Sequence, residues 1–248
     1  QASGLVKSDE EFKRFYSFEE EMLNYFMEHP SANNPVDKNF AIFASGNDGQ
    51  PLSGYPAAHQ KYISVSAFGP DYLPTSYTNY GPGTNIAAPG GDYSINSTSA
   101  TPQRAQILST LPKELGTGEY GYMQGTSMAC PHVSGIAALV LSYAVENGIK
   151  LTNTQLYDII TSSVRNIDND LTGTKTIYYG KPMDMSLAPY KGNMGTGRID
   201  ALMAIMGVRG AMCVPVTVGE EFELKVKNYI GNGDIDVKAN NGYIISDE

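Results

Sequence analysis

The stretch Gly125-Thr-Ser-Met-Ala-Cys-Pro-His-Val-Ser-Gly135 decides how the rest of this 248-residue chain is interpreted. A glycine and two hydroxyl residues stand directly before an apolar run that reaches Asn147, and Gly148 follows where a helix C-cap is expected. The apolar side chains of this run go nearly all round a 3.6-residue repeat. They therefore predict a central, buried helix over residues 127–147.

Short apolar runs on the N-terminal side of this helix are typical of buried parallel strands. Helical patterns alternate with them along the chain, which indicates an α/β fold with a mainly parallel sheet and helices on both faces. The sequence predicts strands at residues 40–45, 62–68, 85–88 and 106–111, helices at 9–28, 127–147, 152–163 and 199–206, and a hairpin near 177–179.

Three Ser/Thr-x-x-Glu/Gln sequences predict capping boxes at helix N-termini. They begin at Ser8, Ser17 and Thr152. Because the second lies inside the helix expected over residues 9–28, that helix could be broken near Ser17. Residues 92–106 are rich in Ser and Thr and predict an exposed insertion.

The pattern changes at the C-terminal end of the chain. Residues 212–248 carry short runs of β-formers separated by Gly-Asn-Gly turns. They are too few to close a sandwich of about 100 residues. We therefore expect one α/β domain over residues 1–211 and the start of a β-rich domain over 212–248.

Composition excludes several classes of function. The chain has 17 Lys plus Arg against 26 Asp plus Glu, a formal net charge of −9, which disfavours binding to nucleic acid or to an anionic membrane. The longest apolar stretch, residues 135–145, is about half of what a bilayer span needs. No two of the five His and Cys residues have metal-ligand spacing, so no metal site is predicted.

The hydroxyl residues of the opening stretch have two physical interpretations. Thr126 or Ser127 could simply cap the helix. Alternatively, the helix dipole and unpaired backbone N–H groups would favour developing negative charge beside Ser127, as a nucleophile that forms an oxyanion requires. Physical arguments alone leave both interpretations open.

Over its eleven residues, the stretch resembles the serine motif of the subtilisin-like serine peptidases (subtilases). It differs from the Gly-x-Ser-x-Gly elbow of α/β-hydrolases, because Ala129 stands where the last glycine should be. The resemblance implies that Ser127 is the nucleophile of a peptide-bond hydrolase.

The segment Ala44-Ser-Gly-Asn-Asp-Gly49 is similar to the family's strand end and the loop that bears the oxyanion-hole asparagine. Taken alone, Asn47 is also typical of a turn before Asp48-Gly49. The resemblance implies an oxyanion role for Asn47, and it implies that Ala44, Ser45, Gly46, Gly125 and Thr126 border the substrate pocket. Further similar segments are residues 54–57, 62–67, 77–81, 86–90 and 195–201.

Two motifs of the family are absent. Subtilases have the chain order Asp, His, Ser, so the Asp-Ser/Thr-Gly and His-Gly-Thr-His motifs should precede Asn47, and neither occurs. His132 cannot replace the histidine, because five helical residues separate two side chains by about 140° and about 7.5 Å. His29 is expected at the surface, and His59 in a loop on the substrate side.

The chain therefore resembles the C-terminal part of a subtilase catalytic domain whose N-terminal part is missing, and alone it is expected to be inactive. The Asp and His would come from the missing segment or from a second chain. A non-catalytic subtilase-like scaffold is the alternative. The resemblance implies protein or peptide substrates, no required cofactor, structural calcium as an option, and a secreted or cell-envelope location. An uncovered sheet edge or helix face would favour homo-oligomers.

Overall fold

The computed structural model describes residues 6–95, 102–115 and 118–210. The β-rich segment expected over residues 212–248 lies outside these ranges, and so does the expected domain boundary.

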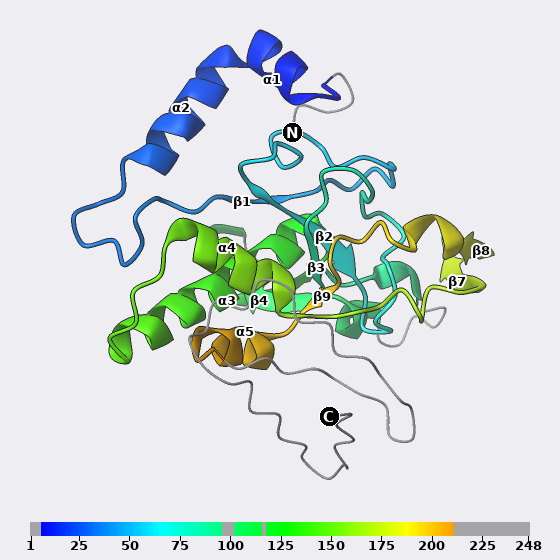
Figure 1. Cartoon of the computed structure of the whole chain (residues 1–248). Coiled ribbons are helices and arrows are strands. Elements are labelled where there is room, and N and C mark those ends of the chain that lie inside the picture. The colour runs from blue at the N-terminus through cyan, green and yellow to red at the C-terminus, as the bar shows by residue number, and fades with distance from the viewer. Residues whose placement is uncertain (1–5, 96–101, 116–117, 211–248) are drawn as a thin grey trace, which may run out of the picture.

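A five-stranded sheet forms the centre of the described part (Figure 1), with the strand order β1-β2-β3-β9-β6. The first four strands in this order run parallel, and β6 is antiparallel to β9. Because β2 is buried at every position, it needs the unbroken apolar and small residues that the sequence shows there. The strands are β1 (Ile42–Ala44), β2 (Ile63–Phe68), β3 (Ile86–Pro89), β9 (Arg198–Ile199) and β6 (Val164–Arg165).

Helices cover both faces of this sheet (Figure 1), which confirms the predicted α/β fold with a mainly parallel sheet. On one face lie α1 (Asp9–Phe15) and α2 (Ser17–Glu28), with Met27 packed against Ala41 and Tyr62. On the other face lie α3 (Thr126–Glu146), α4 (Asn153–Ser162) and α5 (Ala201–Val208).

Helix α3 packs against β1, β2 and β3 as well as α4 and α5, as the core helix of a globular domain does. It is the one helix among the described residues that is long and apolar enough to cross a membrane, with a mean hydropathy of 1.6. The prediction that it is buried all round is wrong, because Leu139 and Val145 are 48% and 60% exposed. Only one stripe is buried, with spacings of three and four residues: Thr126, Ala129, Val133, Ala137, Val140 and Ala144.

Of the three predicted capping boxes, one forms in full and one in half, because the Glu11 carboxylate accepts from the Lys7 N–H and not from the Ser8 N–H. Ser8 accepts a hydrogen bond from the Glu11 N–H at the start of α1, and Thr152 and Gln155 form a full capping box at the start of α4. The capping box predicted at Ser17 is wrong. The break between α1 and α2 falls at Tyr16, one residue earlier, so Ser17 becomes the first helical residue and Tyr16 takes the N-cap position without a side-chain bond.

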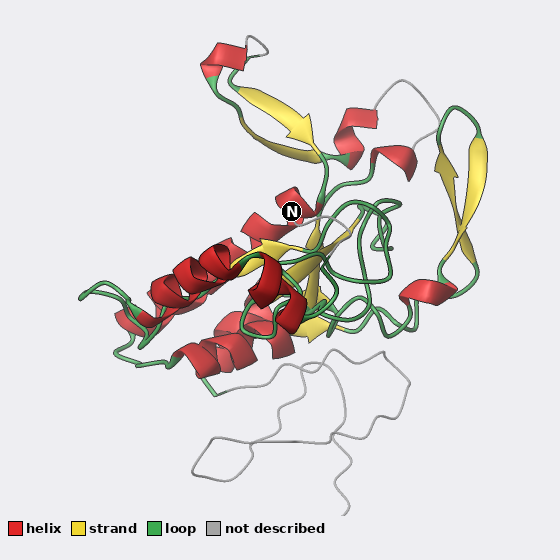
Figure 2. Ribbon diagram, turned by 90° about the horizontal axis from the view of Figure 1, so that it is seen from above, coloured by secondary structure: helices red, strands yellow, loops and turns green. Residues whose placement is uncertain are grey.

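In the part of the chain that the structure describes, two hairpins project from the body of the domain (Figure 2). In the described part of the insertion predicted at 92–106, Asp92, Ser94 and Ala105 are buried rather than exposed. The hairpins are β4 (Ile107–Thr110) with β5 (Tyr120–Met123), and β7 (Thr174–Tyr178) with β8 (Pro182–Ser186). The short 3-10 helices are η1 (Tyr93–Ile95), η2 (Pro102–Ala105), η3 (Lys113–Leu115) and η4 (Ala188–Tyr190).

Candidate active site

Ser127 is the second residue of α3 and is exposed to solvent. The residue at the N-cap is Gly125. Its φ of 143° is a backbone conformation that residues other than glycine rarely adopt. Among the described residues, no acceptor takes the Ser127 N–H, whereas Met128 and Ala129 both donate to the Gly125 carbonyl. A free N–H at the positive end of a 21-residue helix favours an anion beside the Ser127 hydroxyl.

Asn47 lies against the residue that precedes Ser127. Its side-chain Oδ1 accepts two hydrogen bonds from Thr126, one from the backbone N–H and one from the hydroxyl, both at 2.9 Å. A backbone N–H can only donate, so the oxygen of the amide must face Thr126. The Nδ2 group is thereby directed away from Thr126, and it lies 3.5 Å from where a Cβ on Gly125 would stand.

The two segments predicted to border a substrate pocket touch each other. The Gly46 N–H donates to the Thr126 hydroxyl at 3.2 Å, which joins the end of β1 to the start of α3. Ser45 is fully buried and its hydroxyl donates to the Asn79 carbonyl, so its side chain faces the interior. Ala44 is the last residue of β1 and is partly exposed. The catalytic and substrate-binding roles of all these residues stay predictions.

Asn79 lies in one of the segments similar to the family, residues 77–81, but the sequence predicted no role for it. In the structure, its side chain holds the loop that presents Asn47. Asn79 is 4% exposed, and its Oδ1 accepts from the backbone N–H groups of Asp48 and Gln50, each at 3.0 Å. Its Nδ2 donates to the Ser45 carbonyl at 3.2 Å. The position of Asn47 therefore depends on bonds at both ends of its loop.

Tyr77 supports the same region from the side of α3. Its hydroxyl accepts from the Gly125 N–H at 2.9 Å and can donate to the carbonyl of Gly90 or Gly91. The Gly125 N–H also reaches the Gly90 carbonyl at 3.0 Å. Burial raises the pKa of the Tyr77 phenol, which keeps it neutral and able to donate. A Cβ on Gly90 would stand 2.5 Å from that of Ala67, so this close approach requires glycine.

His59 belongs to a different cluster. It is 4% exposed, its ring contacts Phe12 and Tyr62, and its Nε2 lies 4.0 Å from Asp9 and 3.9 Å from Glu20. These partners come from α1, α2 and the loop before β2, and none belongs to α3.

The other two histidines are engaged locally. His132 Nδ1 interacts with the Met128 carbonyl one turn earlier in α3. His29 is exposed, stacks on Tyr25 and interacts with its carbonyl. In the part of the chain that the structure describes, no recorded interaction joins a histidine to Ser127.

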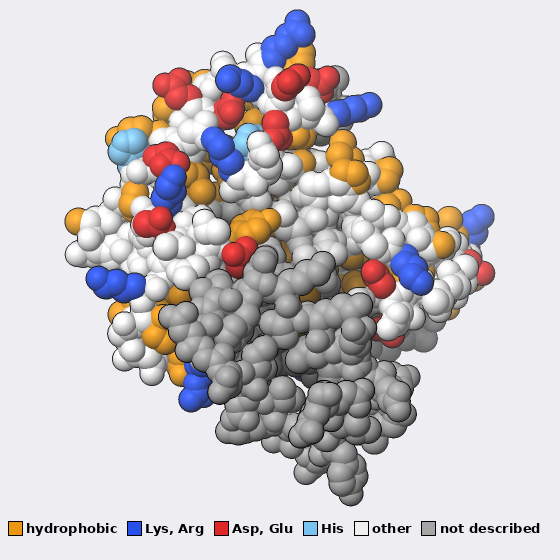
Figure 3. All heavy atoms as spheres, in the orientation of Figure 1, with side chains coloured by type: hydrophobic (Ala, Val, Ile, Leu, Met, Phe, Trp, Pro, Cys, Tyr) orange, Lys and Arg blue, Asp and Glu red, His pale blue; other side chains and the backbone are white. Residues whose placement is uncertain are grey.

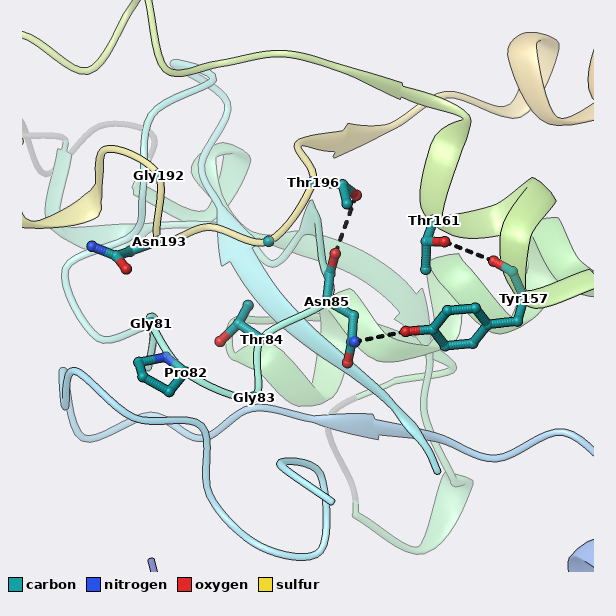
Figure 4. Close-up of a pocket in the computed structure, with 11 residues that line it drawn as sticks. Gly81, Pro82, Gly83, Thr84, Asn85, Tyr157, Thr161, Gly192, Asn193 and Thr196 are labelled. Atoms are coloured by element: carbon teal, nitrogen blue, oxygen red, sulfur yellow. Dashed lines mark hydrogen bonds between the residues drawn. The ribbon is translucent and has the colours of Figure 1, made fainter. Parts of the chain in front are cut away.

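No group of three or more His, Cys, Asp or Glu residues in the described ranges could hold a metal ion. A cavity of about 580 Å³ lies elsewhere, next to Asn85, the residue before β3, and thus at the opposite end of that strand from Gly90. Figure 4 shows Asn85 bonded to the Tyr157 hydroxyl and Thr196 bonded to the Asn85 carbonyl. The cavity contains none of the predicted site residues.

Residues 10–182 match the Subtilase family (peptidase S8). The chain belongs to this family. It is 34% identical over 164 residues to halolysin of Haloferax mediterranei and 34% identical over 170 residues to the extracellular basic protease of Dichelobacter nodosus. These matches cover 66% and 68% of the chain, which spans only 24% and 23% of the two relatives.

A solved structure of a lanthipeptide protease has the same fold. It superposes with a TM-score of 0.56 at 23% sequence identity, over 81% of this chain and 57% of that one. The described residues thus have a subtilisin-like fold, and the chain corresponds to a little over half of that protease.

Proposed function

We propose that this chain carries the nucleophile and the oxyanion hole of a subtilisin-like serine endopeptidase. The Ser127 hydroxyl attacks the scissile carbonyl of a protein or peptide substrate. The Ser127 N–H and Asn47 Nδ2 then donate to the oxyanion that forms on the carbonyl oxygen. Residues 44–46 and 125–126 border the pocket for the side chain before the cleaved bond.

The observation that carries this proposal is the pair of hydrogen bonds from Thr126 to Asn47 Oδ1. A turn asparagine would have no need to bond a residue 79 positions away. No acceptor within the described ranges takes Nδ2, so it stays available as a donor beside the turn that presents Ser127. Mutagenesis of such donors in a related enzyme, one of the best-known cases in catalysis, lowers kcat by about 10²–10³.

A base must remove the Ser127 proton before it can attack, and no described histidine contacts Ser127. We therefore propose that the Asp and His belong to sequence outside residues 1–248, or to a second chain. The proposed location is outside the cell, as the name of the Dichelobacter relative states for that protein.

The test compares this chain with a longer version of the natural protein that contains Asp-Ser/Thr-Gly and His-Gly-Thr-His motifs. A fluorophosphonate probe and a casein substrate report on both, and Ser127→Ala is the control. We expect slow labelling and little proteolysis by the chain alone, because loss of triad members leaves only about 10³–10⁴-fold catalysis over water. Rapid proteolysis by the chain alone that Ser127→Ala abolishes would contradict the proposed missing base.

The second candidate is a binding protein that has kept the subtilase fold without its chemistry. The absence of both acid and histidine motifs from residues 1–248 favours it. If the fluorophosphonate probe fails to label Ser127 in every longer version of the natural protein, the scaffold function replaces the peptidase function.

A further inference from the structure

Lys175 is a buried cation that the proposed chemistry does not use. Its side chain is 4% exposed, although it belongs to β7 in a hairpin that projects from the domain (Figure 2). Its ammonium group donates to the Pro74 carbonyl at 2.7 Å, to Asp92 Oδ2 at 2.8 Å and lies 3.1 Å from Asp71 Oδ2. An ammonium group has three donors, and all three are engaged. The ammonium group therefore links β7 to the segments that carry Pro74, Asp71 and Asp92.

Asp92 is the main partner and is fully buried. It also accepts hydrogen bonds from the backbone N–H groups of Ser76 at 3.2 Å and Ser94 at 3.1 Å, and from the Ser94 hydroxyl at 2.6 Å. A buried carboxylate with this many donors has one defined position. Lys175 thus binds the hairpin to a fixed point between the loop at residue 76 and the segment that follows β3.

Asp92 lies close to the two residues that hold the turn before Ser127 in place, Tyr77 and Gly90. Ser76 is the neighbour of Tyr77, and Asp92 follows Gly90 by two residues. Tyr77 and Gly90 are the two groups that bond the Gly125 N–H. Gly90 is therefore two positions from Asp92, which binds Lys175 directly, whereas Tyr77 is the neighbour of Ser76, whose N–H donates to Asp92.

We propose that Lys175 is a positioning residue for the Ser127 turn, acting through Asp92, Ser76 and Tyr77. The hairpin β7–β8 then does more than extend the surface, because its buried cation holds the N-cap of α3 in place. The catalytic part of this proposal rests on the proposed function, whereas the structural part does not.

The test replaces the ammonium with an uncharged side chain of similar length in Lys175→Met. Because that leaves Asp71 and Asp92 uncompensated, a second variant, Lys175→Met with Asp71→Asn, restores the net charge of the cluster. The matched control is Lys38→Met, which removes the exposed ion pair of Lys38 with Glu28. Hydrogen exchange of the Gly125 amide in the intact chain is measured by NMR, with the amides of β2 as the reference for global unfolding.

We expect the Gly125 amide to exchange about tenfold faster in both Lys175 variants while β2 is unchanged, and no effect of Lys38→Met. In a longer, active version of the protein, kcat should fall about tenfold with KM little changed. Faster exchange confined to residues 174–186, equal acceleration of β2 and Gly125, or failure of both variants to fold would overturn the proposal. A longer version with no activity would refute the proposed peptidase, while the exchange result would still decide the role of Lys175.

Discussion

At the residue scale, two adjacent hydroxyl residues at the start of α3 have different environments. Thr126 is fully buried and its hydroxyl both donates to Asn47 and accepts from the Gly46 N–H. Ser127 is exposed and neither bonds Asn47 nor caps the helix. The cap interpretation of the pair is therefore not realised, because Gly125 occupies the N-cap position. Thr126 instead sets the orientation of the Asn47 amide.

The Thr126 hydroxyl gives a prediction for the active protein. Thr126→Val keeps the backbone bond to Asn47 Oδ1 but removes the second donor and leaves the buried Gly46 N–H without an acceptor. We expect kcat to fall about tenfold with little change in KM, less than the roughly 10²–10³ loss when an oxyanion donor is deleted. Steady-state kinetics with a peptide substrate measure this change in kcat and KM. Thr126→Ser retains the hydroxyl and should keep most activity, and equal losses in both variants would contradict the orienting role.

At the element scale, α5 is held at its start by one carboxylate. The N-cap Asp200 accepts from the Met203 N–H at 3.0 Å and from the Arg165 side chain at 2.7 Å, which also joins α5 to β6. Burial pushes the pKa of Asp200 upward, but these hydrogen bonds and the guanidinium charge outweigh burial and hold the pKa below its usual value. A carboxyl group with a lowered pKa stabilises the fold when it is ionised.

The lowered pKa of Asp200 predicts acid-sensitive stability. Its contribution is fully present above the pKa of an unfolded Asp, about 3.9, and is lost as the pH falls through the lower folded value. Asp200→Asn should therefore lower the free energy of unfolding near pH 7. In this variant the free energy of unfolding should also fall less steeply as the pH drops below about pH 4. Urea unfolding across this range measures the effect. The exposed Asp158→Asn variant should keep the wild-type pH dependence, and an unchanged decline in Asp200→Asn would refute the prediction.

The elements that the sequence predicts well are those with local signals. The strand at 62–68 and the capping box at Thr152 were predictable because continuous apolar residues and reciprocal side-chain bonds need no distant partner. The strands β6 and β9 have two residues each and were not predicted, because only tertiary pairing defines them. Similarly, the resemblance implied that Asn47 and Ser127 belong to one site, whereas the bonds of Thr126 to Asn47 and the roles of Asn79, Tyr77 and Lys175 depend on contacts between distant segments.

At the scale of the whole molecule, the described part leaves apolar surface uncovered. Five large side chains on α1 and α2 point outward at spacings near three and four residues, and in Figure 3 apolar side chains lie among the charged ones over these helices. We call them the α1–α2 apolar face: Phe15, Phe18, Met22, Tyr25 and Phe26, which are 44–68% exposed. In addition, β1 is at the end of the strand order and pairs on one side only among the described strands.

These features predict that the chain associates with itself when it is isolated. Burial of apolar area contributes about 25 cal/mol per Å², so a face of five large side chains can drive contact between copies. We expect light scattering after gel filtration to show dimers or larger species that increase with concentration. Phe18→Gln with Met22→Gln should shift the chain toward monomer. Leu202→Gln changes an equally exposed side chain on α5 and should not. A stable monomer at high concentration, or an equal effect of Leu202→Gln, would show that the α1–α2 apolar face does not drive association. Either result would weaken the hypothesis that part of the domain is missing.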